Sequence, residues 1–442
     1  MKPHGVATAV AAGGLLRLAL WAAVLGRTGT SAMASGDTAS YLDPGQNLLW
    51  HGCFFTAGLA EIGRTPGYPL FLAVCWTLGP AFAALLQAGI STVCIYLVAR
   101  LTRAVFHAEY TADVEYKAWL AAWFFALEPV SIVYSQRLLS ETLFVFLLLL
   151  ALERVAACFV AQRSSALLAG GLWMAAAAFV RPIGFYLPLV VALVLFGFLP
   201  LDRRTRLRAA SILLLASMPW LLAWQARNYL ETGYAGFSSI AVRNAYFYSA
   251  AEVQSRADAL PFASEQQQMG YGDEAAYVAA HPEQHAWSQS ARLQFQKREA
   301  WRIFSAHPRS LIRAQMMGSA VVAFTPCAAD LYRLLDVEPE DAPTRIVHEG
   351  VGAAAVHLLK THPAQAAGMA LLEMWLLVLY GLALRGLFSR ASAPESLVLL
   401  LAVSLWFLAA SGGVQAVGRY RLPVMPVVCV LSAAGWRKAT NR

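Results

Sequence analysis

Long runs without a charged residue constrain this chain more than any other feature. No Asp, Glu, Lys or Arg occurs in residues 65–99, 182–201, 209–226, 396–418 or 422–436. A helix needs about 20 mostly apolar residues to cross a bilayer. Only 14% of the 442 residues are charged, where a soluble protein has about 25%. The sequence therefore predicts an all-α polytopic membrane protein. The first apolar segment is read as a membrane span and not as a cleaved signal peptide.

Basic clusters alternate with the apolar runs and predict the orientation. They are Arg100 with Arg103 and Lys117, Arg163, residues 201–208, Arg385 with Arg390, and the tail 437–442. Placing all of them in the cytoplasm, as the positive-inside rule requires, gives about ten spans with both termini inside. The expected spans are 6–26, 80–101, 118–135, 139–160, 165–180, 183–200, 208–226, 366–386, 396–411 and 421–436.

Two stretches are then expected outside the membrane. Residues 31–78 form a structured first loop, with a helix at the interface over 69–78. Residues 228–365 form a second loop region, in which 310–329 is expected to lie at the interface or dip into the membrane, although a true crossing remains open. The chain thus divides into a membrane catalytic module (1–227), this loop region, and C-terminal spans (366–442).

Net charge, cysteines and histidines give no sign of a nucleic-acid partner, a disulfide or a metal site. The formal charge of +8 is explained by cytoplasmic loops, so no nucleic-acid partner is expected. None of the six cysteines forms a CxxC motif, and no disulfide between Cys53 and Cys327 is expected. His281 and His285 are read as surface histidines, and no metal or other cofactor is predicted.

Polar residues gather at the outer ends of the spans. Arginines on this face oppose the positive-inside trend, and their planar forks match phosphate oxygens. Ionisable side chains near the membrane are candidates for function. The set is Asp37, Tyr41, Arg64, Tyr68, Glu128, Glu141, Arg181, Arg227, Asn228, Arg243, Asn244, Arg419, Tyr420 and Arg421.

Simpler explanations exist for several of these residues. Asp37 has the character of a helix N-cap, and the stretch EIGRTPGYPLF (61–71) has the character of a turn with a snorkelling arginine. Glu141, which follows Ser140 at the start of an apolar run, is also explained by helix capping. Asp43 precedes Pro44 and is assigned to turn chemistry.

Several motifs occur in a characteristic order. An Asp and a Tyr in the first loop are followed by NLLWHG, RTPGYPLF, SETLF, VRP, RN, and GRYRLPVMP. The pattern resembles the GT-C membrane glycosyltransferases, in particular the bacterial branch with lipid A aminoarabinose transferase and the protein O-mannosyltransferase-like enzymes. The resemblance covers most of the chain and is strongest in 31–78, 134–148 and 225–250. Residues 251–367 match nothing in it.

The resemblance implies a GT-C-like bundle that transfers a monosaccharide from a polyprenyl-phosphate donor to a hydroxyl acceptor, by inversion, at the outer face of a bacterial inner membrane. Asp37 would be the base, because a hydroxyl is a weak nucleophile. The arginines and their polar neighbours would bind the donor, with Tyr41, Glu128 and Glu141 supporting them. The acceptor would be a lipid, a glycan or a protein.

The chain departs from the related families in two places. Thr38 follows Asp37 where the eukaryotic protein O-mannosyltransferases have an Asp-Glu pair, and the outer loops contain no Asp-x-Asp. Two rival functions stay open at this point. A transporter or lipid flippase would also carry outer arginines, although matching inverted repeats are not found. A polysaccharide polymerase or ligase would share the outer arginines.

Overall fold

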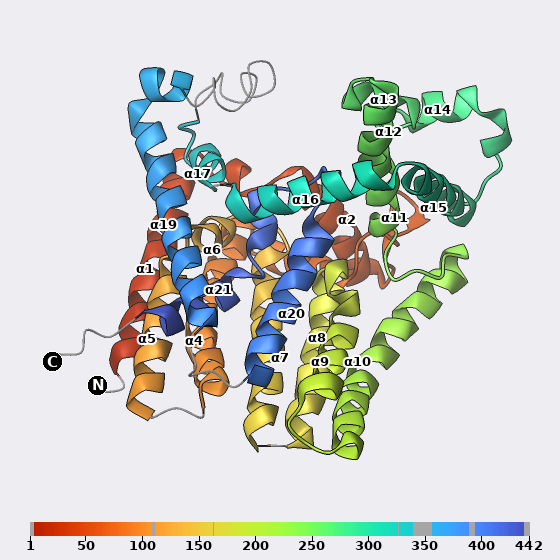
Figure 1. Cartoon of the computed structure of the whole chain (residues 1–442). Helices are drawn as coiled ribbons and strands as arrows, with labels where there is room; N and C mark the ends of the chain where they lie inside the picture. Colours follow the sequence, from red (N-terminus) through yellow and green to blue (C-terminus); the bar gives the residue numbers. More distant parts are fainter. Residues whose placement is uncertain are drawn as a thin grey trace.

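The computed structural model describes residues 4–107, 111–161, 163–325, 327–338, 356–388 and 394–436. Arg390 and the basic tail 437–442, which supported the predicted orientation, lie outside these residues. The long helices run roughly side by side and form a bundle, and the polar segments between them gather at one end (Figure 1). We call this end, which carries α2, α3, α6 and α11–α17, the loop-bearing end.

Helices of the bundle alternate in direction. They are α1 (His4–Arg27), α4 (Pro80–Val105), α5 (Thr111–Ala126), α7 (Glu141–Ala161), α8 (Ser164–Val180), α9 (Leu187–Phe198), α10 (Arg203–Thr232), α19 (Pro363–Leu387), α20 (Pro394–Ser411) and α21 (Met425–Gly435). Within the described residues, α1, α4, α7, α10, α19 and α20 are long and apolar enough to cross a membrane, and α8, α9 and α21 are shorter apolar helices. The predicted all-α polytopic class is confirmed.

The other elements lie at the loop-bearing end. They are η1 (Ser31–Met33), α2 (Gly36–His51), β1 (Phe55–Thr56), β2 (Leu59–Ala60), α3 (Gly67–Trp76), α6 (Pro129–Tyr134), η2 (Pro182–Tyr186), α11 (Ile240–Asn244), the π-helix η3 (Ala245–Ala250), α12 (Ala251–Asp258), α13 (Phe262–Gln268), α14 (Glu274–Ala280), η4 (Pro282–Gln284), α15 (Gln289–Ala306), α16 (Pro308–Phe324), α17 (Ala328–Leu334) and η5 (Gly418–Arg421). The antiparallel strands β1 and β2 pair Phe55 with Ala60.

Local chemistry explains where the helices begin. Gly79, with φ of 96°, precedes Pro80 at the first position of α4, where a missing N–H costs nothing. Asp202 accepts hydrogen bonds from the amides of Arg204 and Thr205 and caps α10. The single span predicted over 118–135 is wrong. Glu128 accepts from the amides of Val130 and Ser131, and this cap with the following proline starts α6 as a separate helix.

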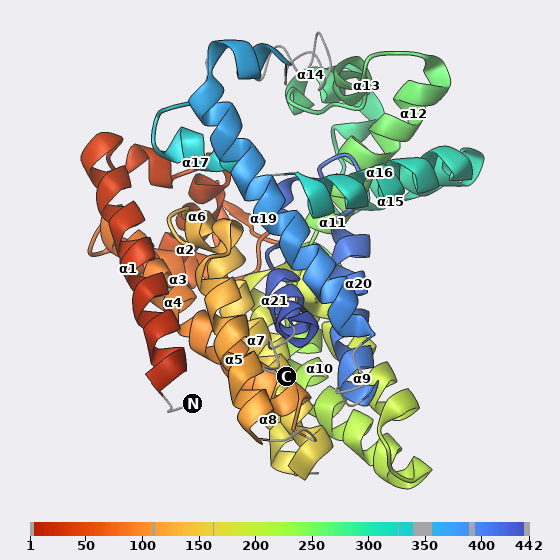
Figure 2. The ribbon, with the colours of Figure 1, turned by 60° about the vertical axis from the view of Figure 1, so that its left-hand side comes forward.

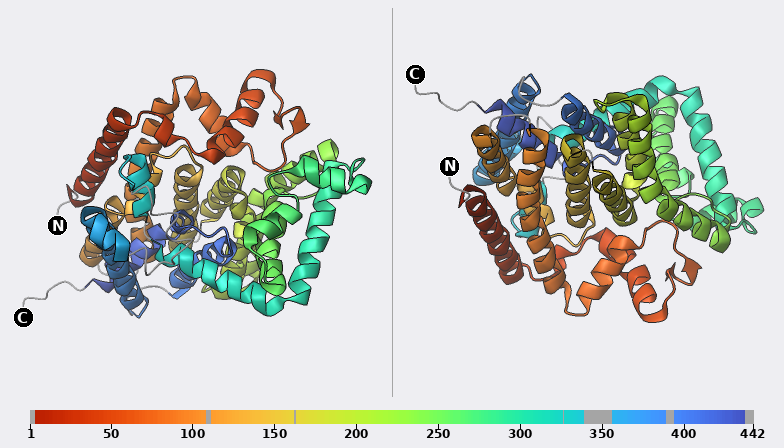
Figure 3. Two further views of the ribbon diagram at one scale, coloured as in Figure 1. Left: turned by 90° about the horizontal axis from the view of Figure 1, so that it is seen from above. Right: turned by 90° about the horizontal axis from the view of Figure 1, so that it is seen from below.

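Burial identifies the centre of the bundle. In an apolar 18-residue stretch of each helix, 72% of the residues of α7 are buried, against 17% of those of α19. α7 packs on α4, α8 and α20. Views along the bundle show α7 surrounded by other helices, with α1 at the rim (Figure 3). Close approach depends on glycine where helices cross, since a Cβ on Gly171 of α8 would lie 2.6 Å from the Leu213 carbonyl of α10.

One helix has a different direction. α16 runs across the loop-bearing end at a steep angle to α19 and α20 (Figures 1 and 2). Several of its apolar side chains are exposed, among them Ile312, Met316 and Phe324. A position of 310–329 at the membrane interface stays a prediction. On its other side, Ser319 donates to the Leu408 carbonyl of α20 at 3.1 Å.

Candidate functional site

Asp37 is not the cap of its helix. It lies in the first turn of α2, and the N-cap is Ser35, whose amide donates to Thr38 Oγ1 at 2.8 Å in a capping box. Thr38 Oγ1 also donates to the Leu138 carbonyl, which fixes the start of α2 against the neighbouring segment. The carboxylate of Asp37 is therefore not needed for capping and is available to other groups.

An alternating chain of charges passes through Asp37. Arg64 Nη2 lies 2.9 Å from Asp37 Oδ1, and Arg419 Nη2 lies 3.3 Å from Asp37 Oδ2. Arg419 Nε lies 3.6 Å from Glu141 Oε1, which Arg181 Nη1 approaches to 2.6 Å. We call Arg64, Asp37, Arg419, Glu141 and Arg181 the ion chain. Its members come from α2, the segment before α3, the start of α7, the end of α8 and η5.

Tyrosines line the ion chain. The Arg64 guanidinium stacks on the Tyr41 ring at 4.2 Å and donates through Nη1 to the Tyr41 hydroxyl at 3.0 Å. Arg181 and Arg419 lie 5.7 Å and 5.2 Å from the Tyr420 ring. Tyr68 packs edge-on against Tyr41 at 4.9 Å. These aromatic faces hold the cations in place by cation–π attraction.

Two opposing effects determine the protonation of Asp37. Burial raises the pKa of its carboxyl, and the charges and hydrogen bonds of Arg64 and Arg419 outweigh burial, so the net pKa is lowered. Asp37 is consequently ionised at neutral pH. Its side chain retains 39% exposure, more than its partners, so a ligand can approach it.

The ion chain contains unsatisfied groups. Among the described residues, Glu141 Oε2 and Arg419 Nε have no hydrogen-bond partner, although both atoms are buried. The carboxyl-bearing residue Glu141 is only 3% exposed. Buried polar atoms normally have partners. The ion chain is therefore a site with spare hydrogen-bonding capacity.

Arg227 and Asn228, both predicted to bind the donor, contact the backbone of neighbouring loops. Arg227 donates to the carbonyls of Glu61 and Phe54, both at 2.8 Å. Asn228 donates to the Gly236 carbonyl at 2.9 Å. The Arg227 bonds join α10 to the first loop and hold the segment that carries Arg64, whereas the Asn228 bond holds the segment that follows α10. Contact between these residues and a donor stays a prediction.

Three other predicted residues are not linked to the ion chain by a described hydrogen bond. Arg243 is exposed at the end of α11, next to the half-buried Asn244. Tyr68 is fully buried and donates to Gln87 Oε1 at 2.8 Å, so it supports Tyr41 from behind.

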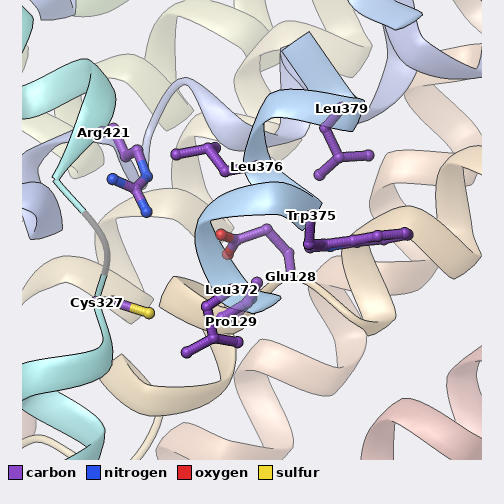
Figure 4. Close-up of a pocket in the computed structure, with 8 residues that line it drawn as sticks. All are labelled: Glu128, Pro129, Cys327, Leu372, Trp375, Leu376, Leu379 and Arg421. Atoms are coloured by element: carbon purple, nitrogen blue, oxygen red, sulfur yellow. The ribbon is translucent and has the colours of Figure 1, made fainter. Parts of the chain in front are cut away.

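Glu128 and Arg421 line a small pocket whose lining contains no member of the ion chain. Figure 4 shows the two charged groups facing the space between α19, α6 and η5, with Trp375 and Leu376 on its apolar wall. Glu128 caps α6, and Arg421 donates to the Thr325 carbonyl. Arg419 and Arg421 both lie in η5 but have different partners, since Arg419 contacts the carboxylates of the ion chain and Arg421 contacts the Thr325 carbonyl.

Two polar residues at the centre of hydrogen-bond networks, one in the site and one inside the bundle, were not identified from the sequence. Ser40 accepts hydrogen bonds from Arg64 at 2.8 Å and 3.1 Å. Arg17, within α1, is fully buried and donates to Ser91 and Ser131. A charge inside an apolar span was a usable signal for Arg17. No local pattern distinguishes Ser40 from an ordinary helical serine.

No group of three or more His, Cys, Asp and Glu side chains in the described parts of the chain is arranged to hold a metal ion. The cysteines are free thiols, and of these Cys53 is exposed while the others are buried.

Comparison with known proteins places the fold. No family model matches the chain, and no curated protein matches it. It is similar to the archaeal oligosaccharyltransferase AglB from Archaeoglobus fulgidus, solved with an inhibitory peptide and a dolichol-phosphate. That match has a TM-score of 0.54 and 15% identity, and it covers 98% of this chain and 50% of AglB. A second oligosaccharyltransferase structure from Archaeoglobus fulgidus, in complex with Zn and sulfate, matches with a TM-score of 0.52 and 13% identity. That match covers 96% of this chain and 48% of the other.

ArnT from Cupriavidus metallidurans, bound to undecaprenyl phosphate, matches 98% of this chain and 78% of its own at 16% identity, with a TM-score of 0.39. The chain spans about half the length of the oligosaccharyltransferase it matches. The similarity defines an all-helical, GT-C-like membrane fold, as the sequence predicted.

Proposed function

We propose that the protein is a glycosyltransferase that moves a monosaccharide from a polyprenyl-phosphate donor to a hydroxyl acceptor at the ion chain. The observation that carries the proposal is the ion chain itself. It gathers three arginines and two carboxylates at the loop-bearing end of a GT-C-like bundle. The GT-C-like AglB structure contains a dolichol-phosphate, which supports a donor of this chemical class.

Charge balance favours a phosphodiester donor. The ion chain carries a net charge of +1, with Arg64, Arg181 and Arg419 against Asp37 and Glu141. A sugar linked through one phosphate to a polyprenol carries one negative charge, which would neutralise the ion chain. When the sugar leaves, the phosphate gains further negative charge. Positioned arginines stabilise charge that develops in this way.

Asp37 has the position of a general base. In the proposed reaction, the acceptor oxygen bonds to the anomeric carbon of the donor and its proton passes to Asp37. The bond between that carbon and the phosphate oxygen breaks, and its electron pair leaves with the phosphate. Attack opposite the leaving group inverts the anomeric centre.

Donor binding would also activate Asp37. In the structure Arg64 and Arg419 hold both carboxylate oxygens and lower the pKa of Asp37, which makes it a weak base. A donor phosphate competes for the same guanidinium groups. As they turn to the phosphate, the pKa of Asp37 rises toward its ordinary value and the carboxylate becomes a stronger base. Asp37 would therefore remain a weak base until a donor is bound.

Glu141 would keep the remaining cations in place. Its Oε1 contacts Arg181 and Arg419, and these contacts fix the positions of both guanidinium groups within the ion chain. The unpartnered Oε2 is available to a hydroxyl group of the transferred sugar.

We further propose that the loop-bearing end faces the periplasm of a bacterial inner membrane, with both termini in the cytoplasm. Cys53 provides a direct test, since it is the exposed cysteine of the first loop. A membrane-impermeant maleimide should label the unmodified chain in intact spheroplasts, and C53S should remove the label. Labelling only after lysis would contradict this orientation.

The reaction is tested with the full chain in lipid vesicles and a panel of labelled polyprenyl-phosphate monosaccharides. Transfer predicts release of free polyprenyl phosphate that depends on one donor and on an added acceptor. Diphosphate-linked donors form the comparison arm. Turnover of diphosphate donors alone would identify a polymerase or ligase instead, and ATP-independent movement of a lipid without bond cleavage would identify a flippase.

A further inference from the structure

A pair of tyrosines lies on the lobe next to the ion chain. Residues 240–306 form this loop lobe, which has its own apolar core including Phe247, Val253 and Ile303. The rings of Tyr248 and Tyr271 meet edge to face at 5.3 Å, and their hydroxyl groups are in hydrogen-bond contact. In Figure 1 the loop lobe stands above α8, α9 and α10 at the loop-bearing end.

Unusual backbone holds each ring in place. Tyr248 lies in the π-helix η3, and π-helices are rare and are frequently found at functional sites. Tyr271 lies between Gly270 and Gly272, both with φ of 87°, a conformation that other residues adopt only with strain. This turn projects the Tyr271 ring outward, and the side chain is 43% exposed.

Contacts from the interior connect the two segments. Gln266, in the helix before the turn, donates to the Phe247 carbonyl of η3 at 2.9 Å. The Phe247 ring packs on Tyr271 at 5.6 Å. The Tyr271 ring is thus held by a glycine turn and by packing on Phe247, and it is still half exposed. A fixed, exposed aromatic ring of this kind can serve as a binding surface.

The pair lies close to the proposed catalytic residues. Ser249, next to Tyr248, lies beside Gly413 in the connection from α20 to η5, which carries Arg419 and Tyr420. Burial, the Tyr271 hydroxyl and the charge of Asp37 raise the pKa of Tyr248. The Tyr248 hydroxyl is thus within electrostatic reach of the carboxylate that would accept the proton.

We propose that Tyr248 and Tyr271 form the acceptor subsite and bind the ring of a sugar, so that the acceptor is a glycan or glycolipid. This inference rests on the proposed function. A pyranose presents an apolar C–H face to an aromatic ring and hydroxyl groups to the tyrosine hydroxyls, and tyrosine combines both kinds of contact. The pair itself carries no cation, which disfavours a phosphate headgroup as its ligand.

The test measures binding of methyl glucopyranoside, mannopyranoside and galactopyranoside to the detergent-solubilised full chain by saturation-transfer NMR. We expect at least one glycoside to bind through its ring protons, and Y271A to weaken it about 5- to 10-fold. Y271A is the main variant because the side chain is half exposed. Y271F, which keeps the ring, should retain most of the binding. W301A is the matched control, because Trp301 is a 72% exposed aromatic residue on the same lobe.

Donor binding is measured separately with undecaprenyl phosphate. Y271A should bind it as the unmodified chain does, whereas R419A should bind it more weakly. If Arg419 does not matter for this lipid, the proposed function fails and not the acceptor subsite. The acceptor subsite is overturned if no glycoside binds, if binding is the same in Y271A and W301A, or if a Ser- and Thr-containing hexapeptide binds through Tyr271 in place of the glycosides.

Discussion

Arginines at the loop-bearing end fall into two groups with different partners. Arg64, Arg181 and Arg419 contact carboxylates in the ion chain. Arg227 and Arg421 donate to backbone carbonyls at segment junctions. A phosphate can replace a carboxylate as the partner of a guanidinium, because both are anions of similar geometry. It cannot replace a carbonyl without leaving a buried acceptor unpaired, which is costly.

The difference predicts which arginines bind a donor and which hold the backbone. Sequence reasoning grouped all of these arginines together because they share a face. The partner of each guanidinium, which only the folded chain reveals, divides the group. The predictions that follow test this division, beginning with the carboxylate at its centre.

The largest effect is expected at Asp37. D37N keeps the shape of the side chain but cannot accept the proton of the acceptor, and general-base contributions are about 100- to 10,000-fold. We expect turnover to fall by at least about 100-fold in protein that still folds. The measurement is release of polyprenyl phosphate by purified variant in vesicles.

The assignment of Asp43 to a turn is wrong, because Asp43 and Pro44 lie inside α2. D43N is the matched control for D37N, since Asp43 is an exposed acid on the same helix. It should retain nearly full activity. Normal turnover by D37N would remove the catalytic role assigned to Asp37.

The second effect compares one arginine from each group. R419A removes a cation of the ion chain and should lower turnover about 100- to 1,000-fold. R227A should leave folded protein with turnover within about 5-fold of normal, and it should reduce stability by about 1–3 kcal/mol because two loop carbonyls lose their donor. Turnover and the thermal unfolding midpoint are measured on both variants. Equal losses of turnover in R419A and R227A would contradict the division of the arginines into two groups.

A smaller effect is expected at Tyr41. Y41F keeps the ring under Arg64 and removes the hydroxyl that accepts from Arg64 Nη1. We expect the KM for the donor to rise about 3- to 10-fold while kcat changes less, because one hydrogen bond to a charged group is lost. A fall in kcat with KM unchanged would instead assign the Tyr41 hydroxyl to the chemical step.

The smallest effect concerns stability at low pH. The lowered pKa of Asp37 means that its stabilising contacts are fully present above the ordinary aspartate pKa of about 3.9. They are lost as the pH falls through the lower folded-state value. The difference in unfolding midpoint between the unmodified chain and D37N should be constant from pH 5 to 7 and shrink below about pH 4. A difference that shrinks between pH 5 and 7 would show that Asp37 is not held by the two arginines.

Much of the fold could be predicted from the sequence, because bilayer crossing depends on local composition. Apolar runs located α4 and α19 to within a few residues, and the resemblance indicated the GT-C-like class. The prediction of one span over 118–135 is wrong, although the sequence contains a local signal for a new helix within it. Glu128 followed by Pro129 is a helix start, and it divides the segment into α5 and α6.

The sequence also determined the candidates for the site. It placed Asp37, Arg64, Glu141, Arg181 and Arg419 at the same end of the bundle, since charged residues at span ends share a face. It could not pair them, because these residues are up to 382 positions apart, and their distances depend on how five segments pack. Ser35 caps α2 through a local capping box with Thr38, and tertiary packing decided that Asp37 contacts Arg64 and Arg419. The same packing gave Arg227 and Arg421 carbonyl partners in place of carboxylates, because a guanidinium takes whichever acceptor the neighbouring backbone brings within reach.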